Sequence, residues 1–290
     1  MVFGGADLHC HSTVSDGLEP PGALVRRALE AGLSALALTD HDAVHGLPEL
    51  EERARGTGLV PVPGVELSTR REGEDVHVLG LFVDPEEPEL VARLLGMREA
   101  RDRRGEAMVG RLAELGIRLE LGELRRTVGD GAFGRPHVAR ALVERRIVAS
   151  EREAFERFLG PGKPGYVPKP RWSLAEAIAA VHRAGGLAVL AHPVWYGAQE
   201  TIRALSAEPG LDGLETVHPD HDIGAQLRLS VLASEKGLLV SGGSDYHGPP
   251  EGRKAVGACR LGEEEWLRLA AAARDRRAAS GRPPVDLSPR

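Results

Sequence analysis

Short apolar runs alternate along the chain with longer segments of helical periodicity. Seven of these runs are β-branched or rich in Leu and have the length of strands. They cover residues 5–11, 33–40, 59–67, 75–83, 186–193, 211–218 and 237–245. Strands that alternate with helices predict a parallel sheet, open or closed into a barrel. Seven strands are too many for a small flavodoxin-like sheet and one fewer than an eight-stranded barrel contains.

Two of the intervening segments carry helix-end signals. Residues 20–32 open with proline and close with glycine, which is the usual asymmetry of helix ends. Residues 173–186 begin with Ser173, have Glu176 three positions later and end in glycine, a capping-box pattern. Both segments are predicted to be helices that connect strands.

One long segment breaks the alternation. Residues 86–169 contain helical patterns but no convincing strand, and they end in a loop rich in Gly and Pro. We predict a helical insertion between the fourth and fifth strands, packed as a lid over one end of the sheet. The barrel domain is then discontinuous, built from residues 1–85 and 170–278, and residues 279–290 form a loose polar tail.

Composition narrows the functional classes. The 290 residues carry a formal net charge of −6, which argues against a broad nonspecific surface for nucleic acids but not against a local basic pocket. The chain contains no run of about 18 apolar residues that would predict a membrane span. Its first residues lack the basic and apolar regions of a secretory signal, and two cysteines, Cys10 and Cys259, do not suggest a disulfide framework. We therefore expect a cytoplasmic protein.

The first predicted strand has an unusual polar face. Asp7, His9 and His11 alternate with Leu8 and Cys10, so the three polar side chains share one face of the strand. A half-exposed edge strand would also have a polar face, but it would more often carry Lys, Glu or Thr than two histidines. The alternative is that both imidazoles converge on something that binds nitrogen ligands.

Similar residues stand on or just after other predicted strands. They are Asp40, His41, Asp42, Glu66, His77, His192, Asp245 and His247. In α/β sheets and barrels the carboxyl ends of the strands form the edge where sites are built. A single histidine there would more often be structural, but six of the eleven histidines at such positions are hard to explain by chance.

This set of residues points to metal ions. Imidazoles and carboxylates without cysteine suit divalent ions such as Zn, Mn or Fe. Nine potential ligands exceed what one or two ions need, whereas three ions that share a bridging carboxylate would use them well. Such ions lower the pKa of a bound water and neutralise charge on a phosphoryl group, which favours hydrolysis.

The motifs also resemble those of a known family. In this order, DLHCHSTVSDG, TDHD, GVE, HVLG, AHP and GSDYHG are similar to the motifs of the polymerase and histidinol phosphatase (PHP) superfamily. The match covers most of the chain outside the insertion. It implies an α/β fold, a distorted seven-stranded (β/α)7 TIM-like barrel with three metal ions, in agreement with the seven predicted strands.

The resemblance implies a ligand set for each ion. The first ion would be held by His9, His11, Glu66 and Asp245, the second by Asp16, His41 and His247, and the third by Glu66, His77 and His192. Asp16 is open to another interpretation, because SDG also reads as a turn and some family members have histidine there. Asp7 and Asp40 have no ligand position and are expected to accept hydrogen bonds from ligand imidazoles, although Asp7 could equally cap the start of its strand.

The insertion narrows the subfamily. FGRPHVARAL resembles a segment of PHP phosphatases that act on 3′,5′-bisphosphonucleotides and short oligonucleotides, including RNase AM-like enzymes. Arg135 would then bind phosphate with its planar fork and His137 would donate a hydrogen bond beside it, at a helix start that favours anions. Without the resemblance, Arg135 would be read as a solvated loop cation. Lys169 could approach the substrate or lie on the surface, and His218 is expected to line the substrate site.

The function implied is metal-dependent phosphoester hydrolysis. The substrates expected are 3′,5′-bisphosphonucleotides, which would lose the 3′-phosphate, and short oligoribonucleotides, degraded from the 5′ end. Asp245 and His247 stand on the attacking side, and Arg135 binds a phosphate. Long duplexes, membranes and obligate protein partners are not expected. The alternatives are a histidinol phosphatase or another small phosphomonoesterase and, in a different class, a noncatalytic metal-binding regulatory module. No ligand is missing, which favours an enzyme. His45 and His221 receive no role.

Overall fold

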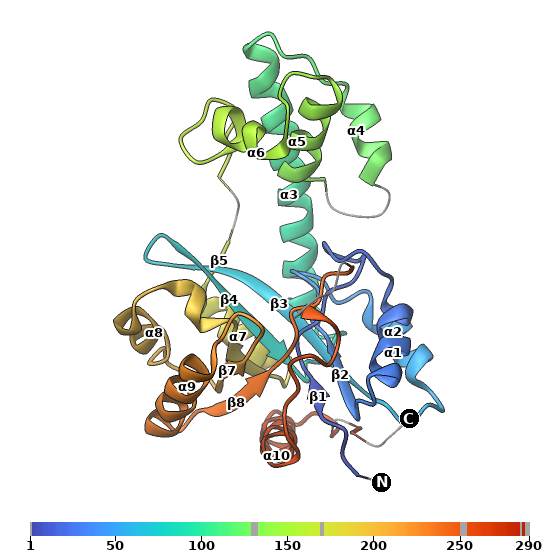
Figure 1. Cartoon of the computed structure of the whole chain (residues 1–290), viewed down its shortest axis with the longest axis vertical. Helices are drawn as coiled ribbons and strands as arrows, with labels where there is room; N and C mark the ends of the chain where they lie inside the picture. Colours follow the sequence, from blue (N-terminus) through green and yellow to red (C-terminus); the bar gives the residue numbers. More distant parts are fainter. Residues whose placement is uncertain (1, 129–132, 169–170, 250–253, 285, 288–290) are drawn as a thin grey trace. The chain divides into compact units, whose positions relative to one another are not determined.

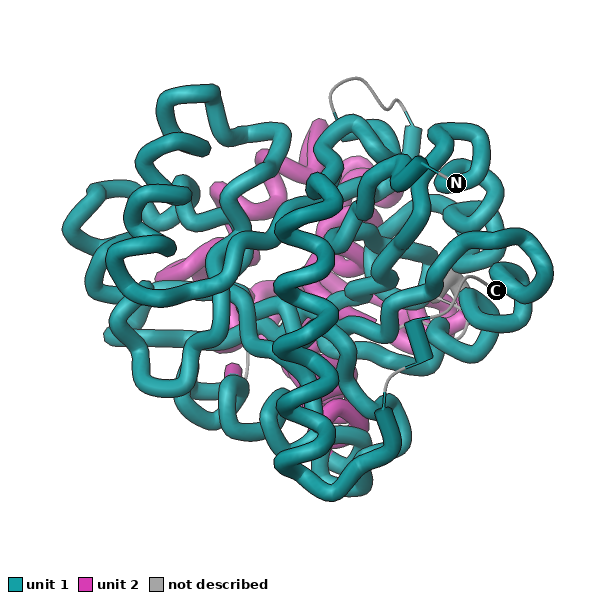
Figure 2. Tube along the Cα trace, turned by 90° about the horizontal axis from the view of Figure 1, so that it is seen from below, with its two compact units in different colours: residues 1–92, 172–290 teal, residues 93–171 magenta. Residues whose placement is uncertain are grey.

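The computed structural model describes residues 2–128, 133–168, 171–249, 254–284 and 286–287 (Figure 1). Contacts divide the chain into two compact units (Figure 2). Unit 1 consists of Met1–Ala92 and Trp172–Arg290, and unit 2 consists of Arg93–Arg171. We describe each unit by itself.

Seven strands of unit 1 form one sheet in the order β1-β2-β3-β4-β6-β7-β8. They are β1 (Ala6–Asp7), β2 (Ala35–Leu38), β3 (Val60–Arg71), β4 (Glu74–Leu81), β6 (Leu187–Leu190), β7 (Gly213–Val217) and β8 (Leu239–Gly242). The two-residue strand β5 (Trp172–Ser173) pairs with β3 outside this order. The N–H of Leu8 donates to the carbonyl of Gly242 over 3.1 Å, and the N–H of Asp245 donates to the carbonyl of His9 over 2.8 Å. These bonds join the first and last strands, so the sheet is a nearly closed barrel, as predicted.

The direction of β4 differs from the prediction of a parallel sheet. β3 and β4 are antiparallel neighbours, and β4 also pairs antiparallel with β6. The reason is the two-residue turn between them, where Glu72 and Gly73 have φ values of 53° and 95°. Positive φ at both turn residues suits a tight hairpin, and such a turn leaves no room for a crossover helix. The start of β4 therefore lies at the edge where the parallel strands end, and His77 pairs with Ser68 there.

Among the described residues, six α-helices lie wholly within unit 1 and connect or follow the strands. They are α1 (Pro21–Glu30), α2 (Leu47–Ala54), α7 (Leu174–Arg183), α8 (Gln199–Leu205), α9 (Ile223–Lys236) and α10 (Glu263–Ala279). The short 3₁₀ helix η2 (Pro193–Tyr196) follows β6. Both helices predicted from end signals are present, and α7 has the expected capping box. The Ser173 hydroxyl accepts from the N–H of Glu176, whose carboxylate accepts from the N–H of Ser173.

Alternate residues of β2 pack into two different buried clusters of unit 1. Ala35 and Ala37 of β2 belong to a buried cluster with residues of β3, β4, β6 and α10, whereas Leu36 and Leu38 pack with residues of α1 and α2. This is the period of two that a strand imposes. One face of the sheet is thereby buried under helices, and the polar groups collect at the strand ends.

The described residues of unit 2 form helices joined by turns and loops, with no strand among them. Helix α3 (Pro88–Glu114) begins in unit 1 and continues into unit 2, where α4 (Leu121–Val128), α5 (Arg135–Glu144), α6 (Glu151–Ala154) and the π-helix η1 (Phe155–Leu159) follow. The unit has its own buried cluster, which includes Met108, Leu112, Phe133 and Leu142. The helical insertion between the fourth and fifth barrel strands is thus present.

Among the described residues, no helix combines the length and the apolar character that crossing a membrane requires.

Candidate metal centre

Histidine and carboxylate side chains from six parts of unit 1 meet at one edge of the barrel. They come from the segment after β1, the segment after β2, strands β3 and β4, and the segments after β6 and β8. The residues are His9, His11, Asp16, His41, Glu66, His77, His192, Asp245 and His247. All nine sequence-predicted ligand residues therefore lie in one cluster.

Glu66 on β3 is the centre of this cluster. Its Oε2 lies 3.3 Å from His9 Nε2, 3.2 Å from His11 Nε2 and 3.1 Å from His41 Nδ1. Its Oε1 lies 2.7 Å from His77 Nδ1 and 3.1 Å from His192 Nε2. One fully buried carboxylate thus faces five imidazoles, three with one oxygen and two with the other. This is the arrangement of a bridging ligand.

Asp245 and Asp16 contact three of these imidazoles, and Asp16 also contacts His247. Asp245 Oδ1 lies 3.5 Å from His9 Nε2 and 3.4 Å from His11 Nε2. Asp16 Oδ1 lies 3.4 Å from His247 Nε2, and its Oδ2 lies 3.7 Å from His41 Nε2. The side chain of Asp16 is 56% exposed, whereas that of Asp245 is 4% exposed. Asp16 therefore closes the solvent side of the cluster.

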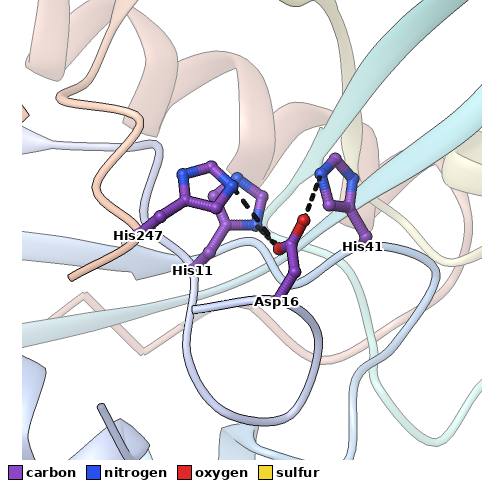
Figure 3. Close-up of side chains that lie close together, drawn as sticks. All are labelled: His11, Asp16, His41 and His247. Atoms are coloured by element: carbon purple, nitrogen blue, oxygen red, sulfur yellow. Dashed lines mark ion pairs between the residues drawn. The ribbon is translucent and has the colours of Figure 1, made fainter. Parts of the chain in front are cut away.

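Three overlapping groups of ligand atoms are compact enough to hold an ion. One comprises His11, Asp16, His41 and His247, which Figure 3 shows around the Asp16 carboxylate. The second comprises His9, His11 and Glu66, and the third comprises His41, Glu66 and His77. Two of these groups differ from the ligand sets that the resemblance implied. His11, expected only at the first ion, also belongs to the group around Asp16. His41 takes the place beside Glu66 and His77 that was expected for His192.

Burial and charge act against each other in this cluster. Burial would lower the pKa of His11, but its hydrogen bonds to Asp245 and Glu66 outweigh that effect and raise the pKa to about 9. At His41 burial prevails and lowers the pKa to about 3. Burial would raise the pKa of Glu66, yet the surrounding histidines hold it well below its usual range. The carboxylates are therefore ionised, and protons and metal ions compete for the imidazoles.

The donor set fits divalent metal ions. His9 Nε2 and His11 Nε2 are only 3.1 Å apart and both point at Glu66. The Nδ1 of His11 is buried and has no hydrogen-bond partner among the described residues. Nitrogen lone pairs that converge on a buried carboxylate are costly without a shared cation. Imidazole with carboxylate and no thiolate is the donor set of borderline divalent ions.

Two candidate ligand residues adopt a backbone conformation that residues other than glycine rarely use. His192 has a φ of 29° directly after β6, and Asp245 has a φ of 49° just after β8. Asp42, after β2, has a φ of 51°. A left-handed residue of this kind costs about 1–3 kcal/mol and tends to occur at functional sites. Here it turns the chain at the end of a strand, beside the metal cluster.

The two predicted supporting aspartates contact groups other than imidazoles. Asp7 accepts from the main-chain N–H groups of Ser244 and Gly257 over 2.9 and 2.8 Å. Asp40 accepts from the N–H and the hydroxyl of Ser12, each over 2.7 Å. The predicted imidazole contact is wrong for Asp40, and for Asp7 it was one of two alternatives beside a cap of its strand. Both carboxylates hold the backbone of segments that carry candidate ligands.

Two residues of the cluster were missed by the sequence interpretation. Glu215 on β7 is fully buried, with Oε1 2.9 Å from His9 Nδ1 and Oε2 accepting from the N–H of His192 over 2.7 Å. Lys254 donates to Asp245 Oδ2 over 2.7 Å. A carboxylate in the apolar stretch GLETV was a visible signal for Glu215. Lys254 had no such signal.

The remaining predicted residues lie in different places. His218 is fully buried, with Nε2 3.5 Å from Asp245 Oδ2, so it borders the cluster. The ring of buried His221 lies 5.0 Å from that of His218, and His45 is exposed between β2 and α2.

Two predicted phosphate-binding residues belong to unit 2. Arg135 is the first residue of α5, with its guanidinium 5.1 Å from the centre of the Phe155 ring. His137 Nδ1 accepts from the N–H of Gly134 over 3.1 Å. Lys169 lies outside the described residues.

Comparisons with known proteins agree with this geometry. A family model described as the PHP domain matches residues 7–144. The 3′,5′-nucleoside bisphosphate phosphatase of Chromobacterium violaceum is 38% identical over 256 residues, which cover 87% of this chain and 90% of that protein. The 5′-3′ exoribonuclease Rnm of Escherichia coli is 38% identical over 268 residues, which cover 90% of this chain and 89% of that protein. A crystal structure from Bifidobacterium adolescentis, assigned as a metal-dependent phosphoesterase, is 33% identical with a TM-score of 0.77 and covers 92% of this chain and 96% of that one.

Proposed function

We propose a substrate class for this chain, which belongs to the PHP family and is a metal-dependent phosphoester hydrolase. It removes the 3′-phosphate from 3′,5′-bisphosphonucleotides and shortens small oligoribonucleotides from their 5′ ends. The observation that carries this proposal is the cluster of nine candidate ligand side chains, in which the Glu66 carboxylate faces five imidazoles. The similarity to a bisphosphonucleotide phosphatase and to exoribonucleases supports the substrate class, since these relatives match nearly the whole chain.

We further propose that three divalent ions of the Mn, Zn or Fe type occupy the cluster. His9, His11, Glu66 and Asp245 would hold the first, and Asp16, His41 and His247 the second. Glu66, His77 and His192 would hold the third, with Glu66 as the bridge. Bound ions would supply charge stabilisation for the phosphoryl group and a more acidic water.

The chain's own residues then have separate tasks. Asp245 and His247 orient the attacking water, because His247 Nδ1 lies 3.5 Å from Asp245 Oδ1 and the side chain of His247 is 36% exposed. His218 lines the substrate site beside Asp245. Arg135 and His137 bind a phosphate that does not react. In support of this, Arg135 starts α5, and the free N–H groups of a helix start favour an anion.

The domain boundaries follow from these roles. We propose residues 1–85 and 170–278 as the catalytic barrel domain, residues 86–169 as the lid domain and residues 279–290 as a tail. The barrel supplies the metal ligands, whereas the lid supplies the proposed phosphate contacts.

The test is phosphate release by manganese-supplemented protein. Adenosine 3′,5′-bisphosphate is compared with histidinol phosphate and with a short 5′-phosphorylated RNA. We expect rapid release from the bisphosphonucleotide, loss of most of it in Arg135→Ala and retention in Arg140→Ala. Arg140 is the matched control because it lies on the same helix with its side chain 60% exposed. Turnover of histidinol phosphate alone would overturn the substrate class. No turnover of any phosphoester by metal-loaded protein would overturn the function.

A further inference from the structure

One tryptophan of unit 1 is exposed at the rim of the metal centre. The three tryptophans of the chain are Trp172, Trp195 and Trp266, and their exposed fractions are 4%, 51% and 7%. Trp195 lies in η2, directly after the candidate ligand His192. Single exposed apolar side chains are common and need no explanation. The surroundings of Trp195, however, set it apart.

The indole of Trp195 is held rigidly against the cluster. Its ring lies 3.9 Å from the ring of His192 at an interplanar angle of 26°, so the imidazole covers one face. Its edge meets His218 at 88° with the ring centres 5.7 Å apart. Its Nε1–H donates to Asp220 Oδ2 over 3.2 Å. A fixed aromatic ring with half of its surface exposed loses little conformational freedom when a second flat ring stacks on it.

Charge is also concentrated over this ring. Lys254 Nζ lies over the Trp195 ring, 5.3 Å from its centre, and it bridges Asp245 Oδ2 at 2.7 Å and Asp220 Oδ2 at 3.7 Å. The lysine therefore ties the indole to a carboxylate of the metal cluster. An aromatic platform next to positive charge is the combination that binds single nucleotides and single strands.

The spacing suits a nucleotide. One imidazole, that of His192, separates the indole from the bridging carboxylate, because His192 Nε2 is 3.1 Å from Glu66 Oε1. One ribose likewise separates a base from its 3′-phosphate. A phosphate at the metal cluster would therefore bring the base to the level of the indole.

We propose that Trp195 is the platform on which the nucleobase of the substrate stacks, so that this residue gives the enzyme its preference for nucleotides over phosphoesters without a base. The inference rests on the proposed nucleotide phosphoesterase function and names the residue that recognises the base. Because every base has a flat face, the platform selects for a base but not for its identity.

Fluorescence tests the platform without relying on turnover. Metal-loaded protein is titrated with adenosine 5′-phosphate and, separately, with ribose 5-phosphate, which lacks the base. We expect adenosine 5′-phosphate to quench the tryptophan emission and ribose 5-phosphate to leave it nearly unchanged. The quenching should vanish in Trp195→Phe and persist in Trp172→Phe, which removes a buried tryptophan. Equal quenching by both ligands, or quenching that survives in Trp195→Phe, would overturn the proposal.

Kinetics separates stacking from an indirect effect on His192. Stacking of a base on an aromatic ring is worth about 5- to 150-fold in affinity. Trp195→Ala should therefore raise KM for adenosine 3′,5′-bisphosphate by about that factor, with a smaller change in kcat. Trp195→Phe should stay within about threefold of wild type because it keeps a flat ring, and inhibition by ribose 5-phosphate should not change.

Each contrary result has one meaning. Equal weakening of both ligands in Trp195→Ala, together with a lower metal content, would show that the indole only supports His192 and would refute the platform. An unchanged KM would refute it as well. If wild-type protein hydrolyses no nucleotide, the proposed function fails, whereas the fluorescence titration still reports on base stacking.

Discussion

Glu215 offers a sharp test of how the centre is built, because it contacts candidate ligands without being one. Its Oε1 is 2.9 Å from His9 Nδ1, and its Oε2 accepts from the main-chain N–H of His192. When His9 binds an ion through Nε2, its Nδ1 carries the proton and donates to Glu215. Burial would raise the pKa of Glu215, but His9 lowers it, so the carboxylate is ionised and accepts both bonds.

Glu215→Gln keeps the shape of this side chain but removes one acceptor. The amide oxygen can accept from His9 or from the N–H of His192, and the amide NH₂ must then face the other donor. An unsatisfied buried donor costs about 1–3 kcal/mol. Removing the hydrogen-bond partner of a ligand histidine lowers metal affinity about 10- to 100-fold, which equals about 1.4–2.7 kcal/mol. The two ranges agree.

The assay is competition for manganese between the protein and a chelator of known affinity. We expect Glu215→Gln to bind its weakest-held ion about 10- to 100-fold less tightly, with kcat recovering in part at high manganese concentration. Thr216→Val is the matched control. Thr216 is the next residue of β7, is 1% exposed, and has an Oγ1 with no hydrogen-bond partner among the described residues. Unchanged affinity in Glu215→Gln would refute the supporting role. An equal loss in Thr216→Val would assign the effect to packing of β7.

Three further predictions follow from the same geometry. Removing the metal with a chelator should lower Tm in calorimetry by about 5–10 °C, because ions present at about 100 times their Kd stabilise a unit of this size by that amount. Glu66→Gln removes the central charge, so most of the Tm difference between metal-loaded and metal-free protein should be lost in this variant. Ser173→Ala should cost about 1 kcal/mol in the free energy of unfolding by urea, because a helix cap is lost, and should leave metal content unchanged. Gly243→Ala should sharply lower stability and metal content, because the added Cβ would lie 2.4 Å from the backbone nitrogen of His9. Gly96→Ala is the control: its added Cβ has no atom within 4 Å, so this variant should be neutral or slightly stabilising. A Gly243→Ala protein as stable as wild type would contradict the close approach of β8 to the segment after β1.

The gathering of the ligands could be predicted because their residue types are unusual at their positions. His41, Glu66 and His192 stand on or next to predicted strands that are otherwise apolar, where solvent-facing or core residues would have been expected. Strand ends that share one edge must bring such residues close together. The local pattern therefore carried the information for the cluster, although it did not carry which atoms approach one another.

The direction of β4 could not be predicted in the same way. The strand residues that lead into the hairpin, Ser68 to Arg71, are polar and continue β3 past its apolar part. In the sequence these polar residues resemble a loop, so the connection between β3 and β4 looks longer than its two residues. The Glu72–Gly73 turn also lacks the Asn-Gly or Asp-Gly pair that usually marks a hairpin. The consequence reaches the site, because only an antiparallel β4 places His77, near its start, beside Glu66.

Glu215 and Lys254 were missed for a different reason. Each is a single charged residue whose partner is remote in the chain, since Glu215 contacts His9 and Lys254 contacts Asp245. Local pattern cannot distinguish such a residue from a solvated charge. Only the pairing of β7 with β8, and the return of the chain after β8 to β1, brings these groups to the cluster.

The candidate ligands also lie on both sides of the seam at which the barrel closes. His9 and His11 follow the first strand, and Asp245 and His247 follow the last. The main-chain bonds across this seam are few, and they include those from Leu8 to Gly242 and from Asp245 to His9. An ion that binds His9, His11 and Asp245 together therefore joins the first strand to the last. Ligand binding to the native state alone stabilises that state, so metal loading and closure of the barrel must be linked. Hydrogen exchange should reveal this linkage as slower exchange of the Asp245 amide in metal-loaded protein, while amides of α7, which packs against β3, β4 and β6 away from the seam, should change far less. Equal slowing at both places would mean that the ions stabilise the barrel as a whole and do not act at the seam.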